Sequence, residues 1–217
     1  MEKYDSRFFV YSDPKMDYMV YELPPTWWSR YYEYEWASKF TGAEDTVLDA
    51  GCGICHPFKF HLSDVCKEVH ACDLDKRILS PEAIINNILN DCGNKVSKPA
   101  LLAYCQKIRF NQCSITSLPY EDKKFDKIFC ISVLEHMSPQ DIKLSLGEFK
   151  RTLRDNGLIV LTFDYPTINL EQFKDTVNEV GLNFVGSFTF NMPEDAVTSN
   201  LWGKLYCYRT VLKKHQL

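Results

Sequence analysis

The sequence has no apolar run that approaches the roughly 18 to 20 residues of a membrane-spanning helix. Its longest apolar stretches lie around Ile128–Leu134 and Leu158–Phe163. The first residues are polar and charged, without the apolar segment that is typical of a secretory signal. We therefore expect a soluble, cytoplasmic protein that has no membrane partner.

Excess positive charge is also missing. The chain has 25 Lys and Arg against 29 Asp and Glu, which gives a formal net charge of −4, and it contains no long basic block. Proteins that bind nucleic acids usually gather Lys and Arg where they contact phosphates. The sequence therefore argues against a nucleic-acid partner.

A disulfide framework is absent as well. The nine cysteines are an odd number and are scattered through apolar contexts, such as those of Cys72, Cys105 and Cys130. Buried single cysteines are typical of reduced thiols that pack in the core of a cytosolic protein.

What is present is the composition of one globular domain: 217 residues, 45% hydrophobic and 25% charged. We expect a single domain with an N-terminal cap (residues 1–44) and a core (residues 45–217). Aromatic residues crowd the cap, and within Trp27–Phe40 their spacing predicts an amphipathic helix. Its predicted stripe is Trp28, Tyr32, Trp36 and Phe40. Such a stripe either forms a lid over a ligand site or only seals the flank of the core.

From Thr46 onward, short apolar runs alternate with helical patterns. The predicted strands are Thr46–Ala50, Glu68–Cys72, Ile108–Cys113, Lys127–Ser132 and Leu158–Thr162. None of them shows the clean polar alternation of a half-exposed strand, which predicts a parallel sheet covered by helices on both faces. The expected fold is thus a doubly wound α/β sheet, whose ligand binds at the carboxyl ends of the strands.

Two of the helices have boundary signals. Ser138 with Pro139 predicts the start of one helix, and Asn156-Gly157 predicts its end. Asn169 predicts the start of the next helix, which Gly181 ends.

Two successive β-like runs follow, Phe184–Phe190 and Lys204–Leu212, with no convincing helix between them. We expect them to form an antiparallel pair at one edge of the sheet.

The sharpest local motif is the glycine loop after the first predicted strand. Gly51 and Gly53 allow a tight turn and a close approach to a ligand, ahead of a helix with Pro57 near its start. The third glycine of a dinucleotide fingerprint is absent. Asp49, two residues before Gly51, would repel a pyrophosphate, so the loop favours a ligand with a cationic group. The alternative is an ordinary tight turn between a strand and a helix.

Asp73 stands at the end of the next predicted strand, 22 residues past Gly51. An acid at this position and spacing is typical of a site that hydrogen-bonds a ribose diol. The alternative is a surface acid that caps the following turn, and Asp75, farther from the strand, is a weaker candidate for the ribose.

Four motifs in order resemble those of class I S-adenosylmethionine-dependent methyltransferases. They are Val47–Gly53, Val69–Asp73, Phe125–His136 and Leu153–Thr162. The resemblance covers about residues 46–166 and implies a seven-stranded, mostly parallel sheet with an antiparallel strand near the C-terminal edge. It implies S-adenosylmethionine as the cofactor and S-adenosylhomocysteine as the product.

The same resemblance implies roles for particular residues. Asp49 and the loop Gly51-Cys52-Gly53 would hold the methionine portion of the cofactor, and Asp73 its ribose. Leu74, Ser114 and Ile115 would lie near adenine. Many members have glycine where Cys55 stands and an acid where Ser114 stands, so a Ser114 hydroxyl or a backbone carbonyl would contact the adenine amino group.

A sulfonium methyl is already activated, so the reaction requires no metal and no covalent nucleophile, only alignment and, for some acceptors, a base. The candidate bases are Glu135, His136 and Asp164, which follow the fourth and fifth predicted strands. Alternatively, Glu135-His136 only shapes the floor of the cofactor site. The candidate substrate contacts are Arg30, Tyr31, Tyr34 and Tyr165.

The absence of two motifs narrows the chemical class of the methyl acceptor. The Asn/Asp-Pro-Pro-Tyr segment of adenine and glutamine methyltransferases and the Pro-Cys of cytosine-C5 enzymes are both missing. We therefore expect a small-molecule oxygen or nitrogen acceptor. Other hypotheses are a nicotinamide-dependent oxidoreductase, a non-catalytic binding module, and a metal or redox site at Cys52-x-x-Cys55 with His56 or His61.

Overall fold

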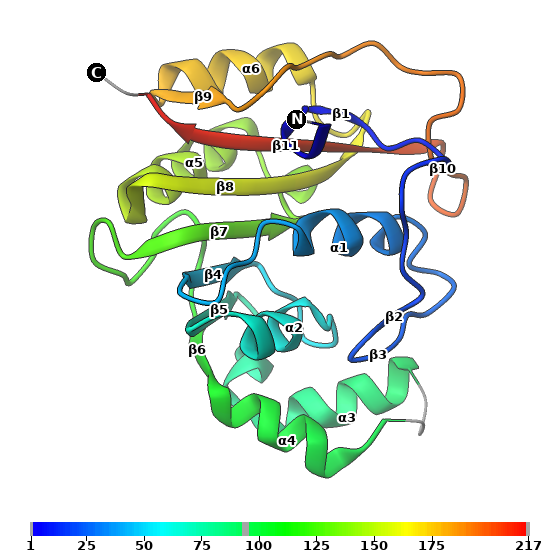
Figure 1. The fold of residues 1–217 in the computed structure, drawn as a ribbon, viewed down its shortest axis with the longest axis vertical. Helices are drawn as coiled ribbons and strands as arrows, with labels where there is room; N and C mark the ends of the chain where they lie inside the picture. Colours follow the sequence, from blue (N-terminus) through cyan, green and yellow to red (C-terminus); the bar gives the residue numbers. More distant parts are fainter. Residues whose placement is uncertain (1, 93–95, 216–217) are drawn as a thin grey trace.

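The computed structural model describes residues 2–92 and 96–215. Within these residues a nine-stranded sheet forms the centre of the molecule (Figure 1). Its parallel strands are β4 (Thr46–Ala50), β5 (Glu68–Asp73), β6 (Ile108–Gln112), β7 (Phe125–Ile131) and β8 (Leu153–Tyr165). The long strand β11 (Leu205–Lys214) is antiparallel to β8. The order β6-β5-β4-β7-β8-β11-β1 confirms the predicted α/β fold with an antiparallel strand near one edge.

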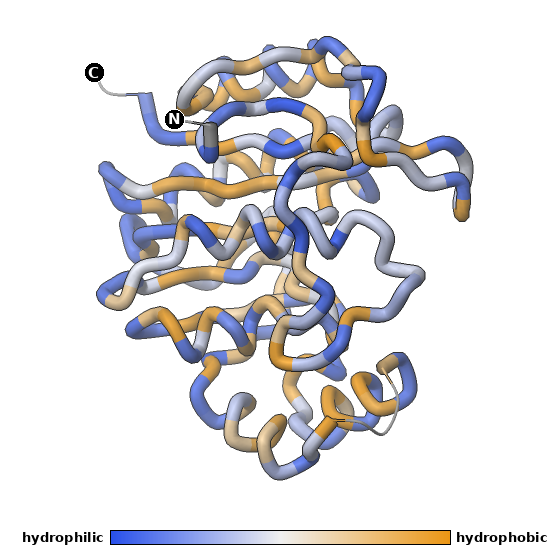
Figure 2. Tube along the Cα trace, turned by 45° about the vertical axis from the view of Figure 1, so that its right-hand side comes forward, coloured by the Kyte–Doolittle hydropathy of each residue, from blue (hydrophilic) through white to orange (hydrophobic). Residues whose placement is uncertain are grey.

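Both faces of the sheet are buried, each in its own hydrophobic cluster. Val47 belongs to one cluster with residues of α1 (Arg30–Ser38), α2 (Phe58–Val65), α3 (Pro81–Cys92) and α4 (Lys98–Lys107). Leu48 belongs to the other, with residues of α5 (Pro139–Thr152) and α6 (Leu170–Glu179). Successive strand residues therefore point into different cores, which explains why the strands read as continuous apolar runs. The outer helices, by contrast, alternate between hydrophobic and hydrophilic residues along their length (Figure 2).

The predicted start of α5 is confirmed, but its predicted end is wrong. Ser138 Oγ accepts the Asp141 N–H at 3.1 Å, and Pro139 is the first helical residue. The helix ends at Thr152, and Asn156-Gly157 lie inside β8 instead of after the helix. A Cβ atom on Gly157 would lie 2.8 Å from the Asp126 carbonyl oxygen. This glycine therefore permits close packing of β7 and β8 rather than a helix exit.

Both predicted ends of α6 are confirmed. Asn169 Oδ1 accepts the Gln172 N–H at 3.0 Å, and Gly181 has a φ of +74° directly after the last turn. The positive φ is a conformation that glycine adopts without the steric cost of a Cβ atom.

The predicted strand Phe184–Phe190 is wrong beyond Phe184. Three short strands pair in succession with the outer edge of β11 (Figure 1). They are β9 (Leu182–Phe184), β1 (Arg7–Phe8) and β10 (Thr198–Ser199). Because β1 lies opposite Tyr208 and Arg209, it occupies the place that residues 185–190 would need.

The aromatic segment contributes to the core through α1, which is shorter than predicted. Tyr32, Trp36 and Phe40 are buried, whereas Trp28 is half-buried. Trp36 Nε1 donates to the Lys3 carbonyl oxygen at 2.8 Å. The remaining short elements are the 3₁₀ turns η1 (Glu2–Tyr4), η2 (Lys76–Leu79) and η3 (Leu134–His136), and the hairpin β2 (Tyr18–Met19) and β3 (Tyr21–Glu22). In the described ranges, no helix has the length and apolar character needed to cross a bilayer.

Candidate active site

The loop after β4 has a backbone that only glycine fits at two positions. Gly51 has a φ of +68° and Gly53 a φ of +61°. A Cβ atom on Gly51 would lie 2.8 Å from Val133 Cγ2, and one on Gly53 would lie 2.4 Å from His56 Cδ2. The neighbouring side chains thus pack directly against the loop, which fixes its course.

Lys59 of the following helix also holds this loop in place. Its side chain is fully buried in α2, and Nζ donates to the carbonyl oxygens of Gly53 at 2.8 Å and His56 at 2.5 Å. Cys52 N–H in turn donates to the Cys72 carbonyl oxygen of β5 at 3.0 Å. A buried ammonium group is held in place by such hydrogen bonds, so the loop has little freedom to change shape.

Two carboxylates lie beside this loop. Asp73 ends β5, where Oδ2 accepts the Gly53 N–H and Oδ1 accepts the Asp75 N–H, both at 2.9 Å. Asp49 is buried in β4. Burial raises the pKa of Asp49 to about 7, and repulsion from Asp73 adds to the increase, although Lys59 opposes it. The carboxylates therefore leave negative charge that a cationic ligand would compensate.

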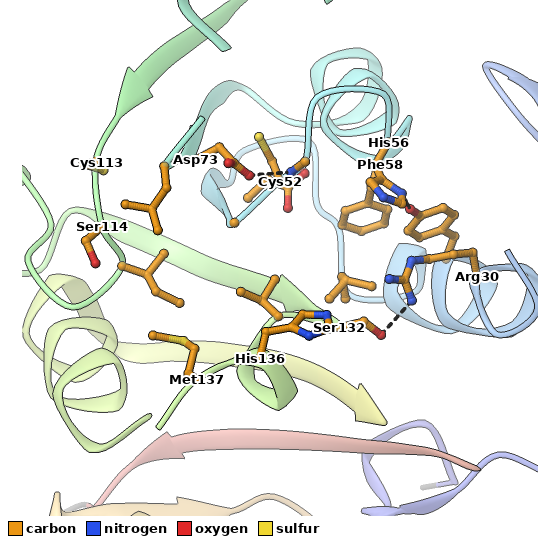
Figure 3. Close-up of a pocket in the computed structure, with 18 residues that line it drawn as sticks. Arg30, Cys52, His56, Phe58, Asp73, Cys113, Ser114, Ser132, His136 and Met137 are labelled. Atoms are coloured by element: carbon orange, nitrogen blue, oxygen red, sulfur yellow. Dashed lines mark hydrogen bonds between the residues drawn. The ribbon is translucent and has the colours of Figure 1, made fainter. Parts of the chain in front are cut away.

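A cavity of about 390 Å³ opens over the loop; we call it the first cavity. Its lining includes every residue that the sequence assigned to the cofactor: Asp49, Gly51, Cys52, Gly53, Asp73, Leu74, Ser114 and Ile115. In Figure 3, Cys113 and Ser114 lie at one end and Arg30 and His56 at the other, with Asp73 and Cys52 between the two ends. The volume falls in the range of sites for small molecules and cofactors.

Arg30 reaches this cavity from α1 and is held by a buried network. Its Nη1 donates to Ser132 Oγ at 2.6 Å and to the Glu33 carboxylate. Ser132 Oγ also donates to Glu33 Oε1 at 2.6 Å, and Thr162 Oγ1 donates to the same oxygen. Burial opposes the ionisation of Glu33, but Arg30 and the two hydroxyl donors outweigh it and lower its pKa.

His56 is also fixed at the cavity wall. Its Nδ1 lies 2.7 Å from Tyr34 Oη, and its ring stacks on Trp27 with the centroids 4.2 Å apart. Burial lowers the pKa of His56 well below its usual value, and the charges of Arg30 and Lys59 lower it further. The imidazole is therefore neutral at physiological pH.

A second cavity of about 320 Å³ adjoins the first, and the two share Arg30, His56 and His136 in their linings. The candidate bases Glu135 and Asp164 line this second cavity together with Trp27, Trp28 and Trp202. Burial and, to a lesser extent, the charge of Asp164 raise the pKa of Glu135 to about 8. Burial likewise raises the pKa of Asp164 to about 7, with a contribution from Glu33.

The four predicted substrate contacts are not all brought together. Arg30 and Tyr34 line the first cavity. Tyr31 Oη instead lies 3.2 Å from the Leu23 carbonyl oxygen and 3.0 Å from that of Pro24, and Tyr31 lines neither cavity. Tyr165 packs edge-on against Phe8, with ring centroids 5.4 Å apart, and is outside both linings as well.

The structure gives no support to a metal site at Cys52-x-x-Cys55. Burial raises the pKa of Cys52 well above its usual value and that of Cys55 to about 12, whereas metals bind the thiolate. Over residues 2–92 and 96–215, no group of three or more His, Cys, Asp or Glu is arranged to hold a metal ion.

Comparison with known proteins identifies the family. Residues 48–161, more than half of the chain, match the family described as a methyltransferase domain. The chain belongs to this methyltransferase domain family. S-adenosylmethionine is its cofactor. No curated protein sequence matches the chain.

Solved structures of methyltransferases share the fold. The chain is 17% identical to a TehB-like S-adenosylmethionine-dependent methyltransferase from Corynebacterium glutamicum, covering 84% of this chain and 86% of that one, with a TM-score of 0.58. It is 17% identical to a putative sarcosine dimethylglycine methyltransferase from Galdieria sulphuraria, covering 84% and 85%, with a TM-score of 0.59.

A third structure is the 1,6-didemethyltoxoflavin-N1-methyltransferase of Burkholderia thailandensis, which contains 1,6-didemethyltoxoflavin and S-adenosylhomocysteine. It is 15% identical, covers 80% of this chain and 72% of that one, and has a TM-score of 0.54. Identities this low show a common fold and leave the acceptor of this methyltransferase to be inferred from its own residues.

Several residues of the site were not predicted from the sequence. Lys59 and Glu33 look like ordinary charges of amphipathic helices, because their partners are carbonyl and hydroxyl oxygens that no spacing reveals. Trp202 lies between two strands in a segment without a motif. His56 carried a weak signal, since it directly follows the glycine loop.

Proposed function

We propose that this methyltransferase transfers the methyl group of S-adenosylmethionine to an oxygen or nitrogen atom of a small-molecule acceptor. The observation that carries the proposal is the pair of adjoining cavities, which share Arg30, His56 and His136. The glycine loop lines the first cavity, and the carboxyl groups of Glu135 and Asp164 line the second. This arrangement suits a donor and an acceptor whose reacting atoms meet where the cavities join.

The first cavity fits the cofactor. Asp73 would accept the ribose hydroxyls, while Asp49, Cys52 and the two loop glycines would surround the methionine portion. Leu74, Ser114 and Ile115 would flank adenine. The glycines leave room where a Cβ atom would clash, and the uncompensated charge of Asp49 suits a cationic ligand.

When it is bound, S-adenosylmethionine supplies an activated methyl group. The protein's own residues then have to hold the acceptor in line, exclude water and accept a proton if the acceptor releases one. Arg30 and Tyr34 are placed to orient the acceptor. Glu135, His136 and Asp164 are the groups that could accept a proton. Tyr31 and Tyr165 would act only by supporting the walls.

The N-terminal segment, residues 1–44, would act as the cap of this single domain. It supplies Arg30 and Tyr34 to the first cavity and Trp27 and Trp28 to the second. These side chains would close the reaction site to solvent, while Tyr32 and Trp36 attach the cap to the core.

A thermal-shift titration tests the proposal. We expect S-adenosylmethionine and S-adenosylhomocysteine to raise the melting temperature, and nicotinamide dinucleotides to leave it unchanged. Formation of S-adenosylhomocysteine in the presence of a small-molecule acceptor would then establish transfer. A response to the dinucleotide alone would favour an oxidoreductase, and cofactor binding without transfer to any acceptor in a broad screen would favour a non-catalytic module.

A further inference from the structure

The second cavity combines two kinds of chemistry. Trp27 and Trp28 are half-buried in its wall, and Trp202 is 68% exposed, which leaves its ring available to a ligand. The carboxyl groups of Glu135 and Asp164 line the same cavity. Glu135 Oε2 and Asp164 Oδ1 are buried and have no hydrogen-bond partner among the described residues. Buried carboxylate oxygens are normally hydrogen-bonded, so these two point to a missing partner.

A positively charged partner suits these two carboxyl groups best. The charged groups that act on Glu135 are Asp164, Glu33 and Arg30. Arg30 is already paired with Glu33 and Ser132, and the neighbouring His56 is neutral. Burial raises the pKa of both cavity carboxyls, with a contribution from Asp164 at Glu135 and from Glu33 at Asp164, so a cation bound beside them would stabilise their ionised forms.

We propose that the acceptor is an amine that binds as an ammonium cation between the tryptophan rings and the Glu135–Asp164 pair. This inference rests on the proposed methyltransferase function and specifies its substrate class. Indole faces attract cations, and a carboxylate forms its strongest hydrogen bonds with charged donors. A neutral alcohol would satisfy the hydrogen bonds but would not stabilise the ionised carboxylates.

The same pair would prepare the amine for reaction. The bound ammonium group loses one proton to an ionised carboxylate of the pair, which frees the electron pair on nitrogen. That electron pair forms the new N–C bond as the C–S bond of the donor breaks, and the electrons of the broken bond stay on sulfur. The products are a methylammonium ion and S-adenosylhomocysteine, and the proton leaves the carboxyl group for solvent.

Binding of a quaternary cation tests this inference without turnover. In protein loaded with S-adenosylhomocysteine, tryptophan fluorescence would be titrated with phenethyltrimethylammonium and with its uncharged carbon isostere, 3,3-dimethylbutylbenzene. We expect the cation to bind at least tenfold more tightly. Equal binding of the two compounds would overturn the inference, and this comparison needs no variant.

Variants of nearly the same shape test whether the two carboxyl groups cause the preference for the cation. We expect Glu135→Gln and Asp164→Asn each to reduce the preference for the cation at least threefold, while Glu121→Gln, a change at an exposed acid, preserves it. Thermal melting of each variant verifies folding. A preference that survives the combined Glu135→Gln and Asp164→Asn changes would exclude these carboxylates as the cation site.

Turnover separates this inference from the proposed function. Phenethylamine and 2-phenylethanol would be compared as acceptors through the release of S-adenosylhomocysteine, with methylation of the amine expected. If the cofactor binds but only the alcohol is methylated, the amine inference fails and the proposed function stands. If the cofactor does not bind, the proposed function fails, and cation preference in the empty protein still decides whether the second cavity is a cation site.

Discussion

The backbone N–H of Gly53 donates to Asp73 Oδ2 at 2.9 Å, which joins the glycine loop directly to the end of the neighbouring strand (Figure 3). Two separate features of the sequence thus form one structural unit before any ligand binds. The second oxygen of Asp73 accepts the Asp75 N–H, so the carboxylate has a fixed orientation. Such preorganisation lowers the entropy that ligand binding has to overcome.

The first prediction concerns this carboxylate. We expect Asp73→Ala to weaken S-adenosylmethionine binding at least tenfold, about 1.4 kcal/mol, because charge-assisted hydrogen bonds to the ribose are lost. Isothermal titration calorimetry measures the change. Asp75→Ala is the matched control, since Asp75 pairs with Arg77, and its affinity should stay within about twofold. Unchanged affinity in Asp73→Ala would refute the ribose assignment.

The second prediction concerns the loop itself. Gly53→Ala places a methyl group against His56 and forces alanine into a left-handed conformation, which costs about 1–2 kcal/mol. We expect loss of stability by about that amount, together with at least tenfold weaker cofactor binding. Gly147→Ala serves as a comparison, because no atom lies within 4 Å of the added Cβ in α5. That variant should gain about 0.5–1 kcal/mol in chemical denaturation.

The third prediction concerns the network under Arg30. We expect Glu33→Ala to reduce the free energy of unfolding by about 3 kcal/mol, because it removes a fully buried carboxylate that holds the half-buried Arg30, Ser132 and Thr162 together. Urea denaturation measures the loss. Glu179→Ala breaks the exposed pair with Lys143 and should cost no more than about 0.5 kcal/mol. Similar losses in the two variants would mean that the buried network contributes no more than a surface pair.

The fourth prediction concerns pH. The folded protein raises the pKa of Glu135 to about 8 and of Asp164 to about 7, so it retains protons that the unfolded chain releases above its ordinary carboxyl pKa values. The stability that these two carboxyl groups contribute in the absence of ligand should therefore fall as pH rises from about 4.5 to 8. Because the amide side chain introduced by Glu135→Gln cannot ionise, this variant should lose less stability over this pH range. At pH 8.5 we expect it to melt at least about 2 °C above the wild type.

At pH 5.5 this advantage of Glu135→Gln should be much smaller, because most of the pH range over which the wild type loses stability lies above that value. Glu121→Gln, at an exposed position, should follow the wild-type profile at both pH values. Differential scanning calorimetry across the pH range provides the comparison. A constant difference between Glu135→Gln and the wild type at all pH values would show that ionisation of Glu135 does not affect stability.

Local signals predicted the parallel core of the sheet well. The strands beginning at Thr46 and Glu68 lack the clean polar alternation of a half-exposed strand because both of their faces are buried. Asn169 and Gly181 marked their helix correctly because caps depend on backbone conformation within a few residues. The residues proposed to bind the cofactor line one cavity for the same reason, since they lie at the ends of neighbouring strands.

Long-range competition decided the features that were predicted wrongly. Phe184–Phe190 has the composition of a strand, but β1 pairs with the same part of β11 from the opposite end of the chain. Asn156-Gly157 resembles a helix exit, yet close packing against Asp126 requires the glycine inside β8. The position of Tyr31 outside both cavities has a local cause instead: it is next to Arg30 in sequence but points toward Leu23, because adjacent helical residues face different directions.

The pairing of β1 with β11 has a consequence for the order in which the protein can assemble. Ser6 Oγ lies 2.8 Å from Thr210 Oγ1, a contact between residues 204 positions apart. During translation, the segment that carries Arg30 cannot be anchored at this edge until β11 has left the ribosome. The segment that lines both cavities would thus be fixed only after β11 has emerged, and this step would be slow compared with formation of the local helices.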